Sequence, residues 1–350
     1  MERKYIILHE YGEPKHFLGL FYLFESNGFG YDQYEVDYIR QFRLGVKKKS
    51  LHHIYKGIKD FIFLHTIQYK KPTKIILSIA PYNKAMVPLR KKLKKHRSYF
   101  FISYTIWDQS VYVHDYNNDQ RIIDEWRGFL LNDVEHIFVV SEKTKREMIL
   151  NNFAKEGKIS VVNHSYKTKV QPKENKRKTN SFITVAVLSE KKGISELLDI
   201  FKTKPELRLI IVGRGPLEDK VKEYANNFSN IIYKGYIDNQ QDLFNLYKEA
   251  SFLLLNSHKE KSWEELFGMV IIESSACGVV PIATNHSGPM EIIHDGIDGF
   301  LCEEGNIGML VEKCEKMGDD EYDIIRKRTI INGQNFYVAN ISKRWQKILE

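Results

Sequence analysis

Two glutamates separated by seven residues, Glu265 and Glu273, are the side chains of this sequence best placed to bind a ligand between them. An apolar run links them, and a helix that begins at Leu266 would place its N-terminus between the two carboxylates. Free backbone N–H groups and the helix dipole attract an anion such as phosphate to such an end. Because eight helical steps span about 12 Å, the two acids suit a ligand with hydroxyl groups at both ends and a charged middle, as in a sugar nucleotide.

The chemical setting of Glu273 supports a binding role. Apolar residues precede it at 270–272 and follow it at 276–277. A carboxylate in such a stretch requires hydrogen-bonding partners or a ligand. A surface acid and an acid on a helix face explain the pair about equally well.

Three other loops follow strand-like runs and carry residues that bind anions. Lys192 lies in the loop 189–193, where a lysine can reach a phosphate, although a turn with solvated lysines explains it equally well. Arg214 lies in the glycine-containing turn 213–216, for which a purely structural role is the better explanation. His286 begins a segment that suits a helix start.

The composition of the 350-residue chain is that of a globular protein with two domains. Hydrophobic residues make up 43%, and no run approaches the roughly 18 apolar residues of a membrane span. The apolar run after the charged N-terminus is too short for a signal peptide. The three cysteines have no metal-binding spacing and form no disulfide framework. We therefore expect a protein of the reducing cytoplasm.

The formal charge of +8 is concentrated in three basic runs: residues 47–49, residues 173–178 and the run from Arg90 to Arg97. A basic surface can bind anionic lipid, nucleic acid or a phosphorylated acceptor. A solvated helix face or a linker is the simpler interpretation of each run. The run from Arg90 to Arg97 is the candidate for a peripheral contact with an anionic membrane, at its inner face, and nucleic acid is the less favoured partner.

Short apolar runs alternate with amphipathic ones, which predicts an α/β fold with parallel sheets covered on both faces. We predict two doubly wound, Rossmann-like domains that face a central cleft, with ligands at the carboxyl ends of the strands. The domains are residues 1–170 and 181–335, joined by a polar linker at 171–180. The strand candidates are residues 5–8, 74–79, 99–106, 136–140 and 159–162, then 182–188, 207–212, 231–233, 252–256 and 280–283.

The second half of the sequence resembles the retaining glycosyltransferases of family 4 (glycosyl transferases group 1), which have the two-domain B fold. The resemblance covers about residues 182–306, including the turn 213–216 and the stretch 235–250. Residues 336–350 would then be the helix that returns to the N-terminal, acceptor-binding domain. The residues that match the family's motifs are Glu265, Phe267, Gly268, Glu273, Gly278, Pro281, Ala283, Thr284, Gly288, Glu291, Asp295, Gly296 and Gly299.

The resemblance implies a role for each part of the motif. Glu265 would contact the donor sugar near the reacting carbon, and Lys192 would neutralise the diphosphate as it leaves. Glu273 would bind the ribose hydroxyls. The remaining donor contacts would come from Phe267, Gly268, Met269, Arg214, Tyr236 and Ile237. The family requires no metal, and no cofactor is expected beyond the nucleotide-sugar substrate.

The first half matches the family less well. The sugar or acceptor contacts that it would supply are Gly12, Trp107, Asp108 and His114. Trp107 occupies the place of a histidine that touches the donor sugar, and His114 is the candidate to replace it. Val187 occupies the place of an arginine that pairs with the diphosphate, and Arg214 is the candidate to replace that residue.

The resulting hypothesis is a retaining, metal-independent glycosyltransferase that moves a sugar from a nucleotide diphosphate to an acceptor hydroxyl of a glycan, lipid or protein. Three alternatives stay open. A sugar-nucleotide epimerase of the same fold would use the donor without an acceptor. A non-catalytic protein would bind the nucleotide sugar only. The positive charge suits a DNA-modifying glucosyltransferase.

Overall fold

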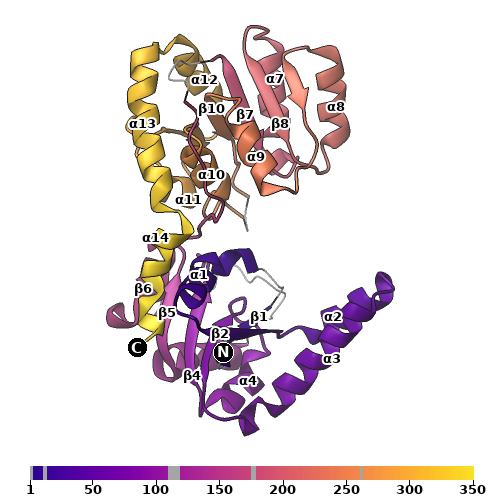
Figure 1. Ribbon diagram of the computed structural model, residues 1–350, viewed down its shortest axis with the longest axis vertical. Helices are drawn as coiled ribbons and strands as arrows, with labels where there is room; N and C mark the ends of the chain where they lie inside the picture. Colours follow the sequence, from indigo (N-terminus) through magenta and orange to yellow (C-terminus); the bar gives the residue numbers. More distant parts are fainter. Residues whose placement is uncertain (1–2, 11–13, 109–118, 175–178, 261–262) are drawn as a thin grey trace. The chain divides into compact units, whose positions relative to one another are not determined.

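The computed structural model describes residues 3–10, 14–108, 119–174, 179–260 and 263–350 (Figure 1). The chain forms two compact units, Met1–His164 with Val338–Glu350, and Ser165–Tyr337. Each unit is built on a parallel sheet of six strands with helices on its faces. The predicted α/β class with two doubly wound sheets is confirmed.

The sheet of the first unit has the strand order β2-β1-β3-β4-β5-β6, and all neighbouring strands are parallel. Its central strands are short runs of β-branched and aromatic residues that are buried on both faces. Strand β2 was not predicted, because this edge strand alternates polar and aromatic residues and has no apolar run. The strands are β1 (Arg3–His9), β2 (Gly30–Glu35), β3 (Lys74–Ser78), β4 (Arg97–Ile102), β5 (Val134–Val139) and β6 (Ile159–Val161).

One face of this sheet carries the main core cluster of the first unit, to which α3, α4 and α5 contribute. The C-terminal segment also belongs to this unit. There the Trp345 ring is fully buried, with its centroid 4.6 Å from that of Phe138 and 5.1 Å from that of Phe101. The helices are α1 (Leu18–Ser26), α2 (Tyr38–Lys47), α3 (Leu51–Thr66), α4 (Met86–Leu93), α5 (Gln120–Gly128), α6 (Glu142–Leu150) and α14 (Val338–Ser342), with a final 3-10 turn at Lys343–Ile348.

The sheet of the second unit has the order β12-β11-β10-β7-β8-β9, and it too is parallel throughout. Strand β12 was not predicted, because it is a three-residue edge strand. The strands are β7 (Ser181–Val185), β8 (Arg208–Val212), β9 (Ile231–Tyr233), β10 (Phe252–Leu255), β11 (Val280–Thr284) and β12 (Phe300–Cys302).

Helices cover both faces of the second sheet. Helices α7, α8 and α12 contribute to one core cluster, while α10 packs on β10 and β11 and against α13. At the α10–α13 contact a Cβ on Gly333 would lie 2.6 Å from the Ala276 nitrogen, so the two helices touch through backbone. The helices are α7 (Ile194–Lys202), α8 (Glu218–Asn227), α9 (Gln240–Tyr247), α10 (Met269–Ala276), α11 (Ser287–Ile292), α12 (Ile307–Lys316) and α13 (Asp319–Asn335).

The polar segment at 171–180 falls within the second unit where it is described. Lys173 anchors it, because its backbone nitrogen donates to the Cys277 carbonyl at 3.0 Å and its Nζ donates to the Ala250 carbonyl at 2.9 Å. Burial, with nearby Arg326, lowers the pKa of Lys173 to about 8. None of the helices among the described residues is both long and apolar enough to cross a membrane.

Candidate nucleotide-sugar site

The strand order of the second sheet brings the predicted ligand-binding loops to one edge. Strand β10 lies beside β7, β7 beside β8, and β8 beside β9. Because these strands are parallel, the loops after them leave the same edge of the sheet. The four loops carry Glu265, Lys192, Arg214 and Tyr236, respectively. Residues far apart in sequence therefore meet where open α/β sheets bind ligands.

Lys192 and Glu265 form an ion pair at this edge. The Lys192 Nζ donates to Glu265 Oε2, and the Ser257 hydroxyl donates to the same oxygen at 3.3 Å. The two side chains are 14% and 15% exposed. The Lys192 Nζ also lies 4.5 Å from the centroid of the Trp263 ring, so a carboxylate and an aromatic face both contact the ammonium group. A mostly buried cation held in this way can stabilise a phosphate charge.

The backbone around the pair is fixed by close contacts. Gly193, directly after Lys192, has a φ of 62°, and a Cβ there would lie 2.3 Å from the Asn256 carbonyl oxygen. Only glycine fits this left-handed conformation and close approach. On the other side, the Glu265 backbone nitrogen donates to His286 Nδ1 at 3.1 Å, and its carbonyl accepts from the Gly288 nitrogen at 3.0 Å.

Helix α10 begins at Met269, three residues later than the predicted start at Leu266. Gly268 precedes it with a φ of 93°, which ends the loop in a left-handed conformation. Glu265 therefore lies on the loop and not on the helix, and the 12 Å spacing estimated for a continuous helix does not apply. Phe267 is buried, and Gly288 packs directly on its backbone, where a Cβ would lie 2.3 Å from the Phe267 nitrogen.

Glu273 lies on α10 and has partners of its own. It is buried, and its carboxylate accepts hydrogen bonds from Gln240 Nε2 and from the Tyr247 hydroxyl, both at 3.3 Å. Burial, and secondly the charge of Glu273, raise the pKa of Tyr247 well above its usual value, so that the phenol stays protonated and donates. Two side chains of α9 thus hold the carboxylate in place.

Arg214 and Tyr236 contact each other at the ends of β8 and β9. The guanidinium carbon lies 4.4 Å from the ring centroid, a cation–π contact. The Arg214 carbonyl accepts from the Leu188 nitrogen at 3.1 Å, which ties this turn to the loop that contains Val187. Val187, at the family's arginine position, is 55% exposed. Ile237 is half-buried in the loop after β9.

The predicted contacts from the first unit are only partly described. Gly12 and His114 lie outside the described residues. Asp108 is exposed. Trp107 is fully buried in the core cluster of the first unit, and its Nε1 donates to the Tyr104 carbonyl at 2.9 Å. Because the Trp107 ring is not exposed, it has no surface that could contact a sugar in this structure.

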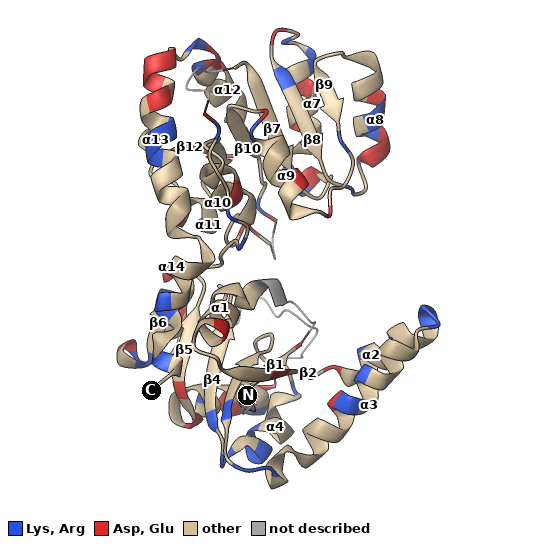
Figure 2. Cartoon of the chain, viewed as in Figure 1, with Lys and Arg blue, Asp and Glu red and all other residues tan. Residues whose placement is uncertain are grey.

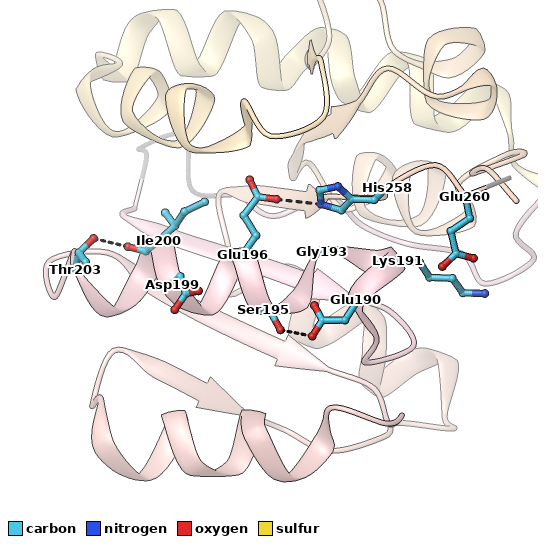
Figure 3. A pocket seen from close by; sticks show the side chains of 10 residues that line it. All are labelled: Glu190, Lys191, Gly193, Ser195, Glu196, Asp199, Ile200, Thr203, His258 and Glu260. Carbon is cyan, nitrogen blue, oxygen red and sulfur yellow. Dashed lines mark hydrogen bonds and ion pairs between the residues drawn. The ribbon is translucent and has the colours of Figure 1, made fainter.

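A separate hollow lies beside the loop of Lys192, with a volume of about 830 Å³ (Figure 3). Helix α7 and its preceding turn supply most of its lining, and His258 faces Glu196 across it, with Nε2 and Oε2 3.0 Å apart. Glu190, Asp199 and Glu260 also line it, so its charge disfavours a diphosphate. Across the described ranges, no group of three or more His, Cys, Asp or Glu residues is arranged to hold a metal ion.

Several residues around the two acids were not singled out from the sequence. Trp263 precedes Glu265 by two residues in a polar stretch. A tryptophan in such a stretch, beside a predicted binding acid, could have been singled out from the sequence. Ser257 and Gln240 carry no such signal, because short polar side chains in loops and at helix starts are common. Only the fold places them on the carboxylates.

Comparisons with known proteins show what the chain is similar to. Residues 166–336, nearly all of the second unit, match the family of glycosyl transferases group 1. The capsular polysaccharide biosynthesis glycosyltransferase CapM of Staphylococcus aureus is 27% identical over 207 residues, which are 53% of this chain and 52% of CapM. The chain thus spans about half the length of this curated relative.

Solved structures extend the likeness to the whole chain. Anabaena Alr3699/HepE, solved in complex with UDP, superposes with a TM-score of 0.68 at 16% identity, covering 99% of both chains. A glycosyltransferase from Rickettsia africae superposes with a TM-score of 0.68 at 19% identity, covering 100% of both. At these identities the likeness establishes the fold. Residues 166–336 thus match the family of glycosyl transferases group 1, and the chain as a whole has the glycosyltransferase-B fold.

Proposed function

We propose that the chain is a retaining, metal-independent glycosyltransferase that transfers a sugar from a nucleotide-diphosphate sugar to an acceptor hydroxyl. The observation that carries the proposal is the Lys192–Glu265 pair, which is mostly buried at the carboxyl edge of the sheet in the unit that matches the glycosyl transferases group 1. HepE, which shares the fold, has been solved with UDP and with UDP-glucose. UDP-sugars are therefore the donors to test first.

In the proposed reaction the bond between the anomeric carbon and the β-phosphate oxygen breaks while the acceptor oxygen bonds to that carbon from the same face. The acceptor proton moves to the departing phosphate, so the products are the glycoside and the nucleoside diphosphate. Negative charge grows on the phosphate as the sugar acquires oxocarbenium character. Lys192 would stabilise the departing phosphate, and Glu265 would both hold Lys192 and contact the sugar.

Arg214 is proposed to supply the second positive charge on the diphosphate. Its turn is hydrogen-bonded to the loop of Val187, where the family has an arginine. Its guanidinium is held over the Tyr236 ring, which limits its conformations. Glu273, held by α9, would accept hydrogen bonds from the ribose hydroxyls.

One observation favours a second candidate, a nucleotide-sugar-binding protein without transferase activity. Val187 leaves the usual arginine position uncharged, and Trp107, at the usual histidine position, is buried. Both changes remove groups that would act on the donor.

A two-step experiment separates these functions. A thermal-shift screen against common nucleotide sugars, with bare nucleotides as controls, identifies a donor through the rise in melting temperature that specific binding causes. That donor is then incubated with the protein and a panel of acceptors, and the released nucleoside diphosphate and the anomeric configuration of the product are measured. Release with retained configuration supports the transferase. Tight binding without any release supports the second candidate, and inverted configuration contradicts the retaining mechanism.

A further inference from the structure

The helices α2 and α3 form a hairpin that extends away from the sheet of the first unit (Figure 1). The two helices pack closely at two glycines. A Cβ on Gly45 would lie 2.6 Å from the Ile54 side chain, and one on Gly57 would lie 3.1 Å from the Phe42 ring. A tight turn joins them, in which Lys49 has a φ of 50°. The hairpin is therefore a preformed element.

An apolar stripe runs along the outer face of α3. Leu51, Tyr55, Ile58 and Ile62 follow the spacing i, i+4, i+7 and i+11, which keeps them on one face of a helix. They are 45% to 83% exposed, whereas the residues that α3 buries lie on its opposite face. Val46, near the end of α2, is also 76% exposed. Such a contiguous exposed apolar surface marks an interaction site.

The same hairpin has a strong net positive charge. Residues 38–66 contain seven lysines and arginines against one acid, Asp60, which gives +6 of the chain's +8. Lys56 pairs with buried Asp60 at 2.9 Å, and Arg40 pairs with buried Glu35 at 2.9 Å, so these two cations are used within the fold and the exposed charge is concentrated at the tip. Figure 2 shows basic residues in blue along both helices and at the turn that joins them, and Lys47, Lys48 and Lys49 at this turn are exposed.

We propose that the α2–α3 hairpin binds the surface of an anionic lipid bilayer, with the apolar stripe in the headgroup region and the tip lysines on lipid phosphates. An amphipathic helix with an apolar face and a basic border is the element that lies in a membrane interface. Each lysine near such a surface contributes a favourable electrostatic interaction. This inference concerns a binding surface only and does not depend on the transfer reaction.

Other occupants fit less well. Nucleic acid would explain the lysines but not the four apolar side chains, which have no partner on a phosphate backbone. A second copy of the chain would cover the stripe but would bring two hairpins of like charge together.

The other basic run also fits less well. Within the run from Arg90 to Arg97, Arg90 bonds Glu125 at 2.9 Å and Asp133 at 2.5 Å, and the Lys92 Nζ donates to the Leu64 carbonyl at 2.9 Å. These cations are already used within the fold.

The test is co-sedimentation of the full-length protein with phosphatidylcholine vesicles, with and without phosphatidylglycerol. Reversing the charge of Lys47, Lys48 and Lys49 to Glu should lower the partition coefficient on the mixed vesicles about a hundredfold, from the contribution of each lysine. Reversing Lys91, Lys94 and Lys95 is the matched control. It changes the same charge at three exposed positions and should leave binding close to that of the wild type.

A second variant tests the apolar stripe. Replacing Leu51, Ile58 and Ile62 by Ser should lower binding at least tenfold, because each buried aliphatic side chain contributes to insertion. All three side chains are exposed, so the melting temperature should not change.

Four results would overturn the proposal. They are no binding of the wild type to mixed vesicles, equal losses from the two charge reversals, full binding by the apolar variant, and a wild-type dimer in sedimentation velocity that the apolar variant dissociates.

Discussion

Removing the ammonium group of Lys192 is the most direct test of the proposed mechanism. In the Lys192→Ala variant the departing diphosphate would lose a cation that is only 14% exposed. A unit charge about 4 Å from a phosphate, at the effective dielectric constant of a protein surface, contributes about 4 kcal/mol. Loss of one preorganised donor in an active site lowers kcat by about 10² to 10³. We expect a decrease in this range at saturating donor.

The neighbouring lysine provides the control. The Lys191 Nζ lies 4.8 Å from the centroid of the same Trp263 ring, but the bond to Glu265 comes from Lys192. Lys191→Ala should therefore change kcat by about twofold at most, as ordinary surface substitutions do. The pair of variants separates the role of the ion pair from that of the general positive charge of the loop.

The assay is release of the nucleoside diphosphate under initial-rate conditions, with its affinity measured separately by calorimetry. In the Lys192→Ala variant, Glu265 keeps the hydrogen bond from the Ser257 hydroxyl but loses its ion pair. Because the ion pair also contributes to folding, the melting temperature is measured as well. A folded Lys192→Ala enzyme whose kcat lies within tenfold of the wild type would refute the assigned role. An equal decrease in Lys191→Ala would also refute it, because the effect would then come from loop charge.

Three further outcomes follow from the structure. Glu273→Gln should weaken nucleotide binding about tenfold or more with a smaller effect on kcat, since the acid would hold the ribose; calorimetry with UDP checks this. Gly213→Ala should lower the free energy of unfolding by about 3 kcal/mol, because Gly213 has a φ of 140° and a Cβ there would lie 1.9 Å from the Ala186 carbonyl oxygen. Gly235 is the control, because it has a φ of 70° but open space around a Cβ, so Gly235→Ala should lower the free energy of unfolding by only about 1 kcal/mol. Urea unfolding measures both changes. Burial, aided by Lys56, lowers the pKa of His9 to about 4 in the folded protein. The folded state therefore favours neutral His9, and this stability is complete above pH 6.5 and is lost as the pH falls towards 4. Urea unfolding should show a loss of about 2 kcal/mol between pH 8 and pH 5, and the His9→Asn variant should not show it.

The sequence predicted the central strands because their apolar runs are buried on both faces, as at β3, where Ile75 and Ile76 are fully buried. It missed β2 and β12 because edge strands carry less of this signal. The start of α10 was also misplaced. The apolar run 270–272 marks the helix, but the left-handed φ of Gly268, which sets its first residue, is a consequence of packing.

The hairpin illustrates a second limit of sequence periodicity. The pattern at 51–63 correctly indicates a helix, and α3 spans Leu51–Thr66. Periodicity alone does not say which stripe faces the core, since α3 carries one apolar stripe inside, with Phe63 and Leu64, and another outside. Only the position of the sheet decides between them, so the exposed stripe could be identified only from the structure.

The two glutamates of the site are close in sequence but depend on different parts of the fold. Glu265 is held by Lys192 and Ser257, which follow β7 and β10, and by the backbone contact with His286 after β11. Glu273 is held by two side chains of α9. The spacing of the acids could be found in the sequence because both belong to one loop–helix segment. Most of their partners could not, because the loops after β7 and β11 and helix α9 supply them. In the proposed function, this separation allows the sugar end of the donor site to change without disturbing the ribose end.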